Sequence, residues 1–227
     1  MRRRSPCPAF RRHPTGLGIV ALVAVATLLA GCSTNSLGGP TRPGGQPAVI
    51  VYGHSYISGV PGQPPPWPKL LAAELGRPLV EIAHGGDVAA RCLSRMESAP
   101  DQPIDSDVVV WECDLNDARR WGTDPAHLAS FRRTFVATVG RMRHGKVIVV
   151  EDPPITGWGL YPPFNHGSVA ALDAYNAIIE QSVTPPVQVV KVLGWDPATM
   201  LARDAIHPND RGKRAIADTV AAAVRSA

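Results

Sequence analysis

Short apolar runs alternate with longer segments of helical periodicity along most of this chain of 227 residues. Five apolar runs have the length of strands and are rich in β-branched residues, at positions 48–52, 79–83, 107–111, 146–150 and 187–193. Between and after them, the apolar spacing predicts helices near 67–75, 88–96, 125–144, 169–182 and 210–224. Alternation of this kind is typical of βαβ units, in which helices cover both faces of a parallel sheet. We therefore expect an α/β fold.

The first 47 residues follow a different pattern. Residues 1–15 contain five arginines and no acidic residue, and an apolar run follows at 17–30. This pattern is typical of a secretory signal peptide, because the run is shorter than the 18 or more apolar residues of a spanning helix. Residues 33–47 are rich in Gly, Pro, Ser and Thr and predict a flexible tether. The expected organisation is a signal peptide at 1–31, a tether at 32–47 and a folded domain at 48–227.

The apolar run closes with Leu29-Ala30-Gly31-Cys32. This tetrapeptide resembles the cleavage box of bacterial lipoproteins, in which the cysteine becomes the new N-terminus and carries the lipid. The resemblance implies an exported protein of the bacterial cell envelope that is anchored to a membrane through a lipid on Cys32. The alternative is an ordinary cleaved signal peptide with an incidental cysteine.

The formal net charge of +4 comes from the leader. Removing residues 1–31 takes away five arginines and no acidic residue, which leaves the remainder close to neutral. The rest of the sequence has no zinc-ligand spacing, no Gly-rich phosphate loop and no interleaving of aromatic and basic residues. We therefore expect no nucleic-acid partner, no metal and no cofactor.

A serine follows the first predicted strand. The run at 48–52 stops at Gly53, and Ser55 comes two residues later, where ligands bind in open α/β sheets. A serine there can also be an ordinary turn or helix-capping residue. Near the other end of the chain, Asp204 precedes His207 by three residues, so both side chains can lie on one side of a helical turn. Because a serine nucleophile needs a base and the base needs an orienting acid, we predict those roles for Ser55, His207 and Asp204.

Four sequence blocks resemble the SGNH or GDSL-type hydrolases, a family of esterases, lipases, deacetylases and acyltransferases. The blocks are Gly53-His54-Ser55, Gly85-Gly86-Asp87, Asn116-Asp117 and Asp204-Ala205-Ile206-His207-Pro208. The resemblance implies a three-layer sandwich with a five-stranded parallel sheet in flavodoxin-like order. It also implies an oxyanion hole formed by the backbone N–H groups of Ser55 and Gly86 and by the side chain of Asn116. No Gly-x-Ser-x-Gly motif surrounds Ser55, which separates the chain from the α/β-hydrolases with a nucleophile elbow.

Two positions depart from the family's blocks. His54 stands where the first block has an aspartate, and Asp114 stands where the third block has a glycine. A carboxylate about 7 Å from the developing oxyanion would cost about 2 kcal/mol at an effective dielectric constant of about 20. The alternative is that the Asp114 side chain points to water. Neither departure changes a residue of the predicted triad.

A loop at 153–167 is the part of the predicted domain richest in Pro, Gly and aromatic residues. Trp158, Tyr161 and Phe164 are its aromatic side chains, and they either wall the substrate pocket or pack beneath the loop. The segment 61–67 is a candidate for the facing rim.

Cys92 and Cys113 are the two cysteines that remain if Cys7 is cleaved off and Cys32 is lipidated. Export would place them in an oxidising compartment, where a disulfide can form between them. Two buried free thiols are the alternative. The other histidines, which show no metal-ligand spacing, are expected at the surface or in packing, although His84 and His166 are near enough to site loops to touch substrate.

The expected function is that of an exported serine esterase that hydrolyses carboxylic esters through an acyl-enzyme. One alternative is an acyltransferase or deacetylase that acts on cell-envelope glycans with the same triad. The other is a non-catalytic, ligand-binding lipoprotein. The expected partners are an ester substrate and, through the lipid anchor, a membrane.

Overall fold

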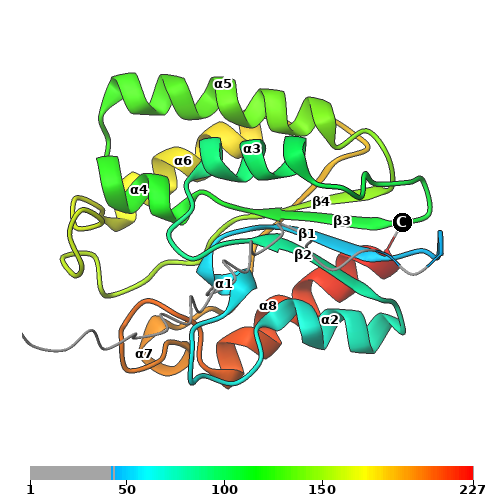
Figure 1. Cartoon of the computed structure of the whole chain (residues 1–227). Helices are drawn as coiled ribbons and strands as arrows, with labels where there is room; N and C mark the ends of the chain where they lie inside the picture. Colours follow the sequence, from blue (N-terminus) through cyan, green and yellow to red (C-terminus); the bar gives the residue numbers. More distant parts are fainter. Residues whose placement is uncertain (1–41, 43, 227) are drawn as a thin grey trace, which may run out of the picture. The chain divides into compact units, whose positions relative to one another are not determined.

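The computed structural model describes residue 42 and residues 44–226 (Figure 1). The predicted signal peptide, the lipidation site at Cys32 and most of the predicted tether lie outside the described residues. Arg42, near the end of the predicted tether, is attached to the domain. Its backbone N–H donates to Asp101 Oδ2 at 2.6 Å and its guanidinium pairs with Asp107 Oδ2 at 2.8 Å. Asp107 also accepts the N–H of Ala48 at 2.8 Å, which fixes the entry to the first strand.

Five parallel strands form one sheet in the order β2-β1-β3-β4-β5. The strands are β1 (Val49–Gly53), β2 (Leu79–Ala83), β3 (Val108–Glu112), β4 (Lys146–Val150) and β5 (Gln188–Val190). Every residue of β1 and β3 is buried, because helices cover both faces, and this explains the unbroken apolar runs in the sequence. The expected α/β class and flavodoxin-like strand order are confirmed.

Helices form two layers, one on each face of the sheet (Figure 1). One layer contains α2 (Trp67–Leu75) and α8 (Asp210–Arg225), which pack against each other. The other contains α3 (Ala89–Ser98), α5 (Pro125–Arg141) and α6 (Val169–Ser182). Asp124 begins α5 as expected, because its side chain accepts the N–H groups of Ala126 and His127 at the helix start. Gly76 ends α2 with a φ of 61°.

Three short helices were not predicted. They are α1 (Ser55–Ser58), α4 (Leu115–Trp121) and α7 (Pro197–Met200). Each has only one or two turns, which is too few for a helical period to show in the sequence. Both α1 and α4 directly follow a strand, so they lie at the edge of the sheet where ligands are expected.

Two predicted ends lie three residues beyond the observed ones. The fifth strand ends at Val190 rather than at 193, because the chain leaves β4 there and Leu193 is 87% exposed. The helix predicted to run to 144 ends at Arg141, where Met142 has non-helical dihedral angles. Among the described residues, no helix is long and apolar enough to span a membrane.

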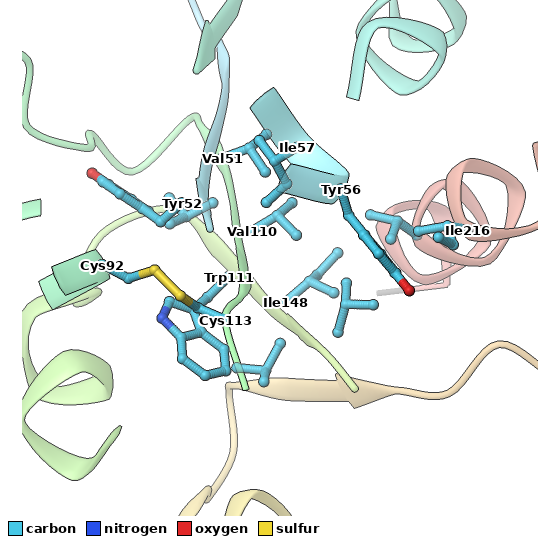
Figure 2. Close-up of a cluster of buried hydrophobic side chains, with 14 of the residues drawn as sticks. Val51, Tyr52, Tyr56, Ile57, Cys92, Val110, Trp111, Cys113, Ile148 and Ile216 are labelled. Carbon is cyan, nitrogen blue, oxygen red and sulfur yellow. A yellow bond between two sulfur atoms is a disulfide. The ribbon is translucent and has the colours of Figure 1, made fainter. Parts of the chain in front are cut away.

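The hydrophobic core lies on both sides of the sheet (Figure 2). Trp111 of β3 packs against Phe135 of α5 with ring centroids 5.0 Å apart, while Ile57 and Ile216 are buried near the opposite layer. At the end of β1, only glycine fits. A Cβ atom on Gly53 would lie 2.2 Å from the Glu112 carbonyl oxygen of β3. The close approach of the two strands there places the next residues, which begin α1, directly at the edge of the sheet.

Candidate functional site

Three side chains from opposite ends of the chain form a hydrogen-bonded series. Ser55 Oγ lies 2.8 Å from His207 Nε2, and His207 Nδ1 lies 2.8 Å from Asp204 Oδ2. Because a carboxylate can only accept, Nδ1 carries the proton and Nε2 is free to accept from the Ser55 hydroxyl. The second oxygen of Asp204 accepts the backbone N–H groups of Ile206 at 3.0 Å and His207 at 2.9 Å. The geometry is that of a nucleophile, its base and an orienting acid.

Local structure holds the two halves of this series together. Ser55 is the first residue of α1, immediately after β1. The loop that carries Asp204 and His207 lies between α7 and α8, and it includes Ala205 with a φ of 60°. The Tyr56 hydroxyl, next to the serine, donates to the Ile206 carbonyl at 2.5 Å. Tyr56 therefore joins α1 to the loop that carries Asp204 and His207. The sequence analysis did not anticipate this contact.

Burial and hydrogen bonding shift the pKa of both ionisable partners of the serine. Burial lowers the pKa of His207 below 6.5, although the hydrogen bond and charge of Asp204 oppose this, and the positive charge of Arg119 lowers the pKa further. Burial alone would raise the pKa of Asp204, but the hydrogen bonds from His207 and Ile206 bring it below 3.8. Near neutral pH, His207 is therefore a neutral base beside an ionised carboxylate.

The family resemblance assigns three residues to an oxyanion hole, and the structure brings them to one cavity. Ser55, Gly86 and Asn116 all line one cavity. Within the described residues, the backbone N–H groups of Ser55 and Gly86 donate no hydrogen bond to another protein group. Asn116 uses one N–H of its amide to donate to the Asp87 carbonyl at 2.9 Å, and the amide has a second N–H to offer. Gly86 has a φ of 81°, a conformation that favours glycine.

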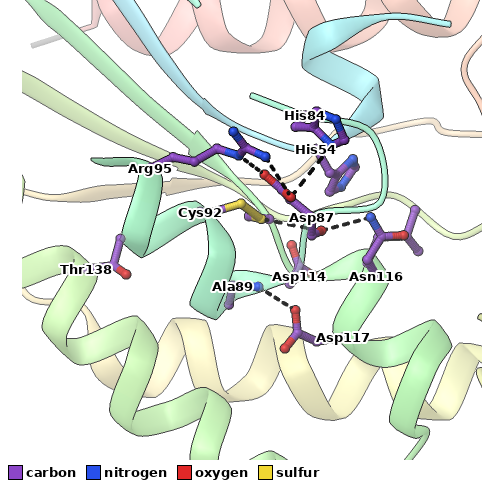
Figure 3. The surroundings of a disulfide bond; sticks show 12 residues. His54, His84, Asp87, Ala89, Cys92, Arg95, Asp114, Asn116, Asp117 and Thr138 are labelled. Carbon is purple, nitrogen blue, oxygen red and sulfur yellow. Dashed lines mark hydrogen bonds and ion pairs between the residues drawn. A yellow bond between two sulfur atoms is a disulfide. The ribbon is translucent and has the colours of Figure 1, made fainter. Parts of the chain in front are cut away.

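A disulfide and an aspartate link the segment after the Gly86 loop to the helix that carries Asn116 (Figure 3). The structure contains a disulfide between Cys92 of α3 and Cys113, the residue that follows β3. Asp117 of α4 accepts the N–H of Ala89 at the start of α3 at 2.7 Å. Burial raises the pKa of Asp117 to about 7, although the Ala89 hydrogen bond opposes the shift. Together these contacts tie the start of α3 to the end of β3 and to α4.

His54, one of the two family departures, is buried beneath the site. Its Nε2–H donates to Asp152 Oδ2 at 2.9 Å, and its Nδ1 accepts the N–H of Tyr56 at 3.3 Å. Asp152 Oδ2 also accepts the N–H of Leu115 at the start of α4, at 3.0 Å. Burial would raise the pKa of Asp152, but its interactions with His54 lower it below 3.8. His54 and Asp152 thus connect α1 with α4. The sequence analysis did not single out Asp152.

Asp114 is the other departure from the family's blocks. The alternative that its side chain points to water is wrong. Its side chain is fully buried, because Asp114 lies in the turn between β3 and α4 beside Asp152. Burial, with the neighbouring charge of Asp152, raises its pKa well above 3.8. This shift favours the protonated form of the Asp114 carboxyl. A protonated Asp114 would place no negative charge opposite an oxyanion, and the variant Asp114→Asn tests this.

The cavity next to Ser55 has a volume of about 420 Å³. Tyr161 and Phe164, from the loop at 153–167, line the cavity, as one of the two alternatives for that loop predicted. Pro61, from the segment 61–67, lines it as well. Trp158 does not line the cavity; it packs against the hydrophobic core. Arg119 of α4 lines the cavity and was not singled out in the sequence.

The remaining histidines do not reach the cavity. His84 is exposed and its Nδ1 donates to the Gly85 carbonyl at 2.8 Å. His166, near the end of the loop at 153–167, is also exposed, and its backbone N–H donates to the Arg119 carbonyl. Among residue 42 and residues 44–226, no cluster of His, Cys, Asp and Glu has the geometry of a metal site. A second cavity of about 480 Å³ between β5 and α6 includes none of the predicted site residues.

Comparisons with known proteins bear on the family and on the fold. The sequence model of the GDSL-like lipase/acylhydrolase family matches residues 51–215. A search of curated proteins found no match. The fold is similar to the crystal structure of the lipase/acylhydrolase from Enterococcus faecalis (14% identity, TM-score 0.57), which covers 79% of this chain and 95% of that chain. It is also similar to a carbohydrate esterase family 3 protein from Talaromyces cellulolyticus (20% identity, TM-score 0.56), with 79% of this chain and 96% of that chain covered.

Proposed function

Because the chain belongs to the GDSL-like lipase/acylhydrolase family, we propose that it is a serine esterase that hydrolyses carboxylic esters through an acyl-enzyme on Ser55. One observation carries the proposal. Ser55 Oγ lies 2.8 Å from His207 Nε2, and His207 Nδ1 lies 2.8 Å from Asp204, all beside a cavity. A hydroxyl hydrogen-bonded to a neutral imidazole can be deprotonated as it attacks a carbonyl carbon.

In the first half of the reaction, Ser55 Oγ forms a bond to the ester carbonyl carbon and His207 Nε2 takes the hydroxyl proton. Asp204 stabilises the imidazolium that forms. The carbonyl oxygen gains negative charge, and the N–H groups of Ser55, Gly86 and Asn116, three residues that line the cavity, are the donors proposed to stabilise it. Collapse of this intermediate breaks the bond to the alcohol oxygen. The proton on His207 passes to that oxygen, and the alcohol leaves.

In the second half, a water molecule attacks the acyl group on Ser55 while His207 accepts one of its protons. The resulting intermediate breaks the Ser55–acyl bond, the proton returns to Ser55 Oγ, and a carboxylic acid is released. No electron donor or acceptor is needed, since the net reaction is addition of water to an ester. The lowered pKa of His207 supports both halves, because the imidazole must be neutral at the start of each.

We also propose that the protein is exported and held at a membrane by a lipid on Cys32. The support from the sequence is the arginine-rich start, the apolar run and the closing Leu29-Ala30-Gly31-Cys32. The disulfide between Cys92 and Cys113 adds support, because structural disulfides persist mainly in oxidising compartments.

Steady-state kinetics on p-nitrophenyl esters of graded acyl length test the esterase proposal. Ser55→Ala and His207→Ala should each remove most of kcat, and the double variant should be scarcely worse than either single variant, because the two residues act as a unit. Asp204→Asn should reduce kcat through the wrong histidine tautomer while the fold is retained. Circular dichroism checks folding. Near-native turnover by Ser55→Ala, or losses that multiply in the double variant, would contradict the proposal.

A further inference from the structure

Arg119 is an unusual side chain in the cavity beside Ser55. The other side chains that line the cavity are mostly apolar or belong to the proposed reaction machinery: Val60, Pro61, Tyr161, Phe164, Ile206 and Asn116. Of the charged groups there, Asp204 is committed to His207 and to two backbone N–H groups. Arg119 is therefore the charge in the cavity whose role the esterase chemistry does not explain.

The guanidinium of Arg119 is held in place but has no counterion. Arg119 is only 6% exposed, and one of its terminal N–H groups donates to the Leu160 carbonyl at 3.2 Å. Its guanidinium carbon lies 5.5 Å from the centre of the Phe164 ring. Within the described part of the chain, no carboxylate lies within ion-pair distance of it, and its buried Nε has no hydrogen-bond partner.

A buried cation without a counterion is costly, so the arrangement favours an anion from outside the chain. A guanidinium has five N–H donors in a planar fork, and the fork matches the two oxygens of a carboxylate. Stacking on Phe164 and the bond to Leu160 fix the orientation of the fork before any ligand binds. An ester that enters this cavity with a carboxylate would supply the missing partner.

We propose that Arg119 binds a carboxylate of the substrate, so that the preferred substrates are esters that carry a carboxylate near the scissile bond. This inference rests on the proposed serine esterase function. The carboxylate can belong to the acyl group or to the alcohol, and both sources share the same recognition by the guanidinium fork. Arg119 is thus a specificity-determining residue on the same helix as Asn116.

Two pairs of esters separate these sources. Phenyl hydrogen glutarate against phenyl 5-methylhexanoate tests a carboxylate in the acyl group, because the members have nearly the same shape and differ in charge. The pair 3-acetoxybenzoate against 3-acetoxybenzamide tests a carboxylate on the alcohol side. For at least one pair, wild type should favour the anionic member in kcat/KM by about tenfold or more, chiefly through KM, since charge-assisted hydrogen bonds are of that strength. Reactions without enzyme correct for spontaneous hydrolysis.

The variants are Arg119→Met, Arg119→Lys and Arg120→Met. Arg119→Met should abolish the preference for the anionic ester, and Arg119→Lys should restore part of it, because the charge returns without the fork. Arg120 is the matched control, because it also lies over Phe164, at 5.8 Å, but is exposed and does not line the cavity. Arg120→Met should keep the wild-type preference. Thermal melting verifies that all variants fold.

Several outcomes would overturn the inference. The first is that wild type shows no preference for the anionic ester in either pair. The second is that the preference survives Arg119→Met. The third is that Arg119→Met lowers kcat/KM equally for both members of a pair, which would indicate that Arg119 only holds the segment around Leu160. If neutral esters are hydrolysed in a Ser55-dependent manner without the preference, the inference about Arg119 fails and the esterase proposal stands. If no ester is hydrolysed and Ser55 does not react, both fail.

Discussion

Two buried carboxyl groups near Ser55 have pKa values shifted in opposite directions. Burial would raise the pKa of Asp152, but hydrogen bonds from His54 and from backbone N–H groups lower it, whereas burial beside Asp152 raises the pKa of Asp114. The ionised form is therefore favoured at Asp152, which positions α1 and α4, and the neutral form is favoured at Asp114.

Asp114→Asn tests this assignment. The raised pKa of Asp114 favours a neutral carboxyl, and an amide should replace a neutral carboxyl with a change in kcat/KM of less than about threefold. An ionised Asp114 that opposed the oxyanion would instead cost about 2 kcal/mol, so its removal would raise the rate by about 30-fold. Asp152→Asn is the matched control, and we expect it to lower the free energy of unfolding by about 3–5 kcal/mol. Ester kinetics and urea unfolding of both variants make the comparison.

The pH dependence of kcat/KM follows from His207. Imidazolium cannot accept the Ser55 proton, so the rate should fall as the pH drops through the His207 pKa. Burial lowers this pKa, so the midpoint should lie below 6.5 in wild type. Arg119→Met should move the midpoint upward, because it removes a positive charge that lowers the pKa. A pH–rate profile at constant ionic strength measures both, and a wild-type midpoint above 6.5 would contradict the account.

Sequence reasoning reaches some of these residues and not others. Ser55, His207 and Asp204 stand out because their types and positions suggest one chemistry. Asp152 and Arg119 do not, because an aspartate before a proline is typical of a turn and an arginine outside the predicted elements is typical of a solvated surface. The available signal for Asp152 was its place two residues after a buried strand, at the same edge of the sheet as Ser55.

At the scale of elements, the site depends on how α3, α4 and the end of β3 are joined. The disulfide and the Asp117–Ala89 hydrogen bond hold the Gly86 loop against Asn116. The strands were predictable because burial on both faces leaves unbroken apolar runs. The short helices α1 and α4 were not, although they carry Ser55, Asn116 and Arg119. Their starts are set by contacts with distant segments, such as Asp152 with Leu115.

Removing the disulfide should lower stability. The bridge joins residues 21 positions apart, and a loop of this size corresponds to about 3 kcal/mol in the chain-entropy model. Cys92→Ala/Cys113→Ala should therefore lower Tm by about 6–12 °C, given the size of the domain. Wild type treated with a reductant should melt like the variant. A Tm difference of less than about 2 °C would show that the bridge adds little stability.

At the scale of the whole molecule, residues from both ends of the domain meet at the carboxyl edge of one parallel sheet. Ser55 follows β1, while Asp204 and His207 precede the last helix, and the strand order places β1 inside the sheet, between β2 and β3. This arrangement was predictable, because each site residue follows a strand and carboxyl ends of parallel strands share an edge. The walls of the cavity were less predictable. The packing of the loop decides that Phe164 lines the cavity and that Trp158 packs against the core.

Membrane attachment should depend on one sulfur atom. If the lipid is carried by Cys32, then Cys32→Ala should abolish metabolic fatty-acid labelling and move the protein from the membrane fraction to the soluble fraction, or leave it uncleaved. The matched control is Cys7→Ala, which lies in the predicted signal peptide and should change neither result. Unchanged labelling of Cys32→Ala would contradict the proposed anchor.

The most direct test of the account is covalent labelling of the proposed nucleophile. A fluorophosphonate reacts with a serine activated by a neutral histidine, so the residue 42–227 domain should gain the mass of one phosphonyl group per chain, and peptide mapping should place it on Ser55. His207→Ala should slow labelling strongly, and Ser55→Ala should not be labelled at all. Labelling at another serine, or none in a folded wild-type protein, would contradict the claim that Ser55 is the nucleophile.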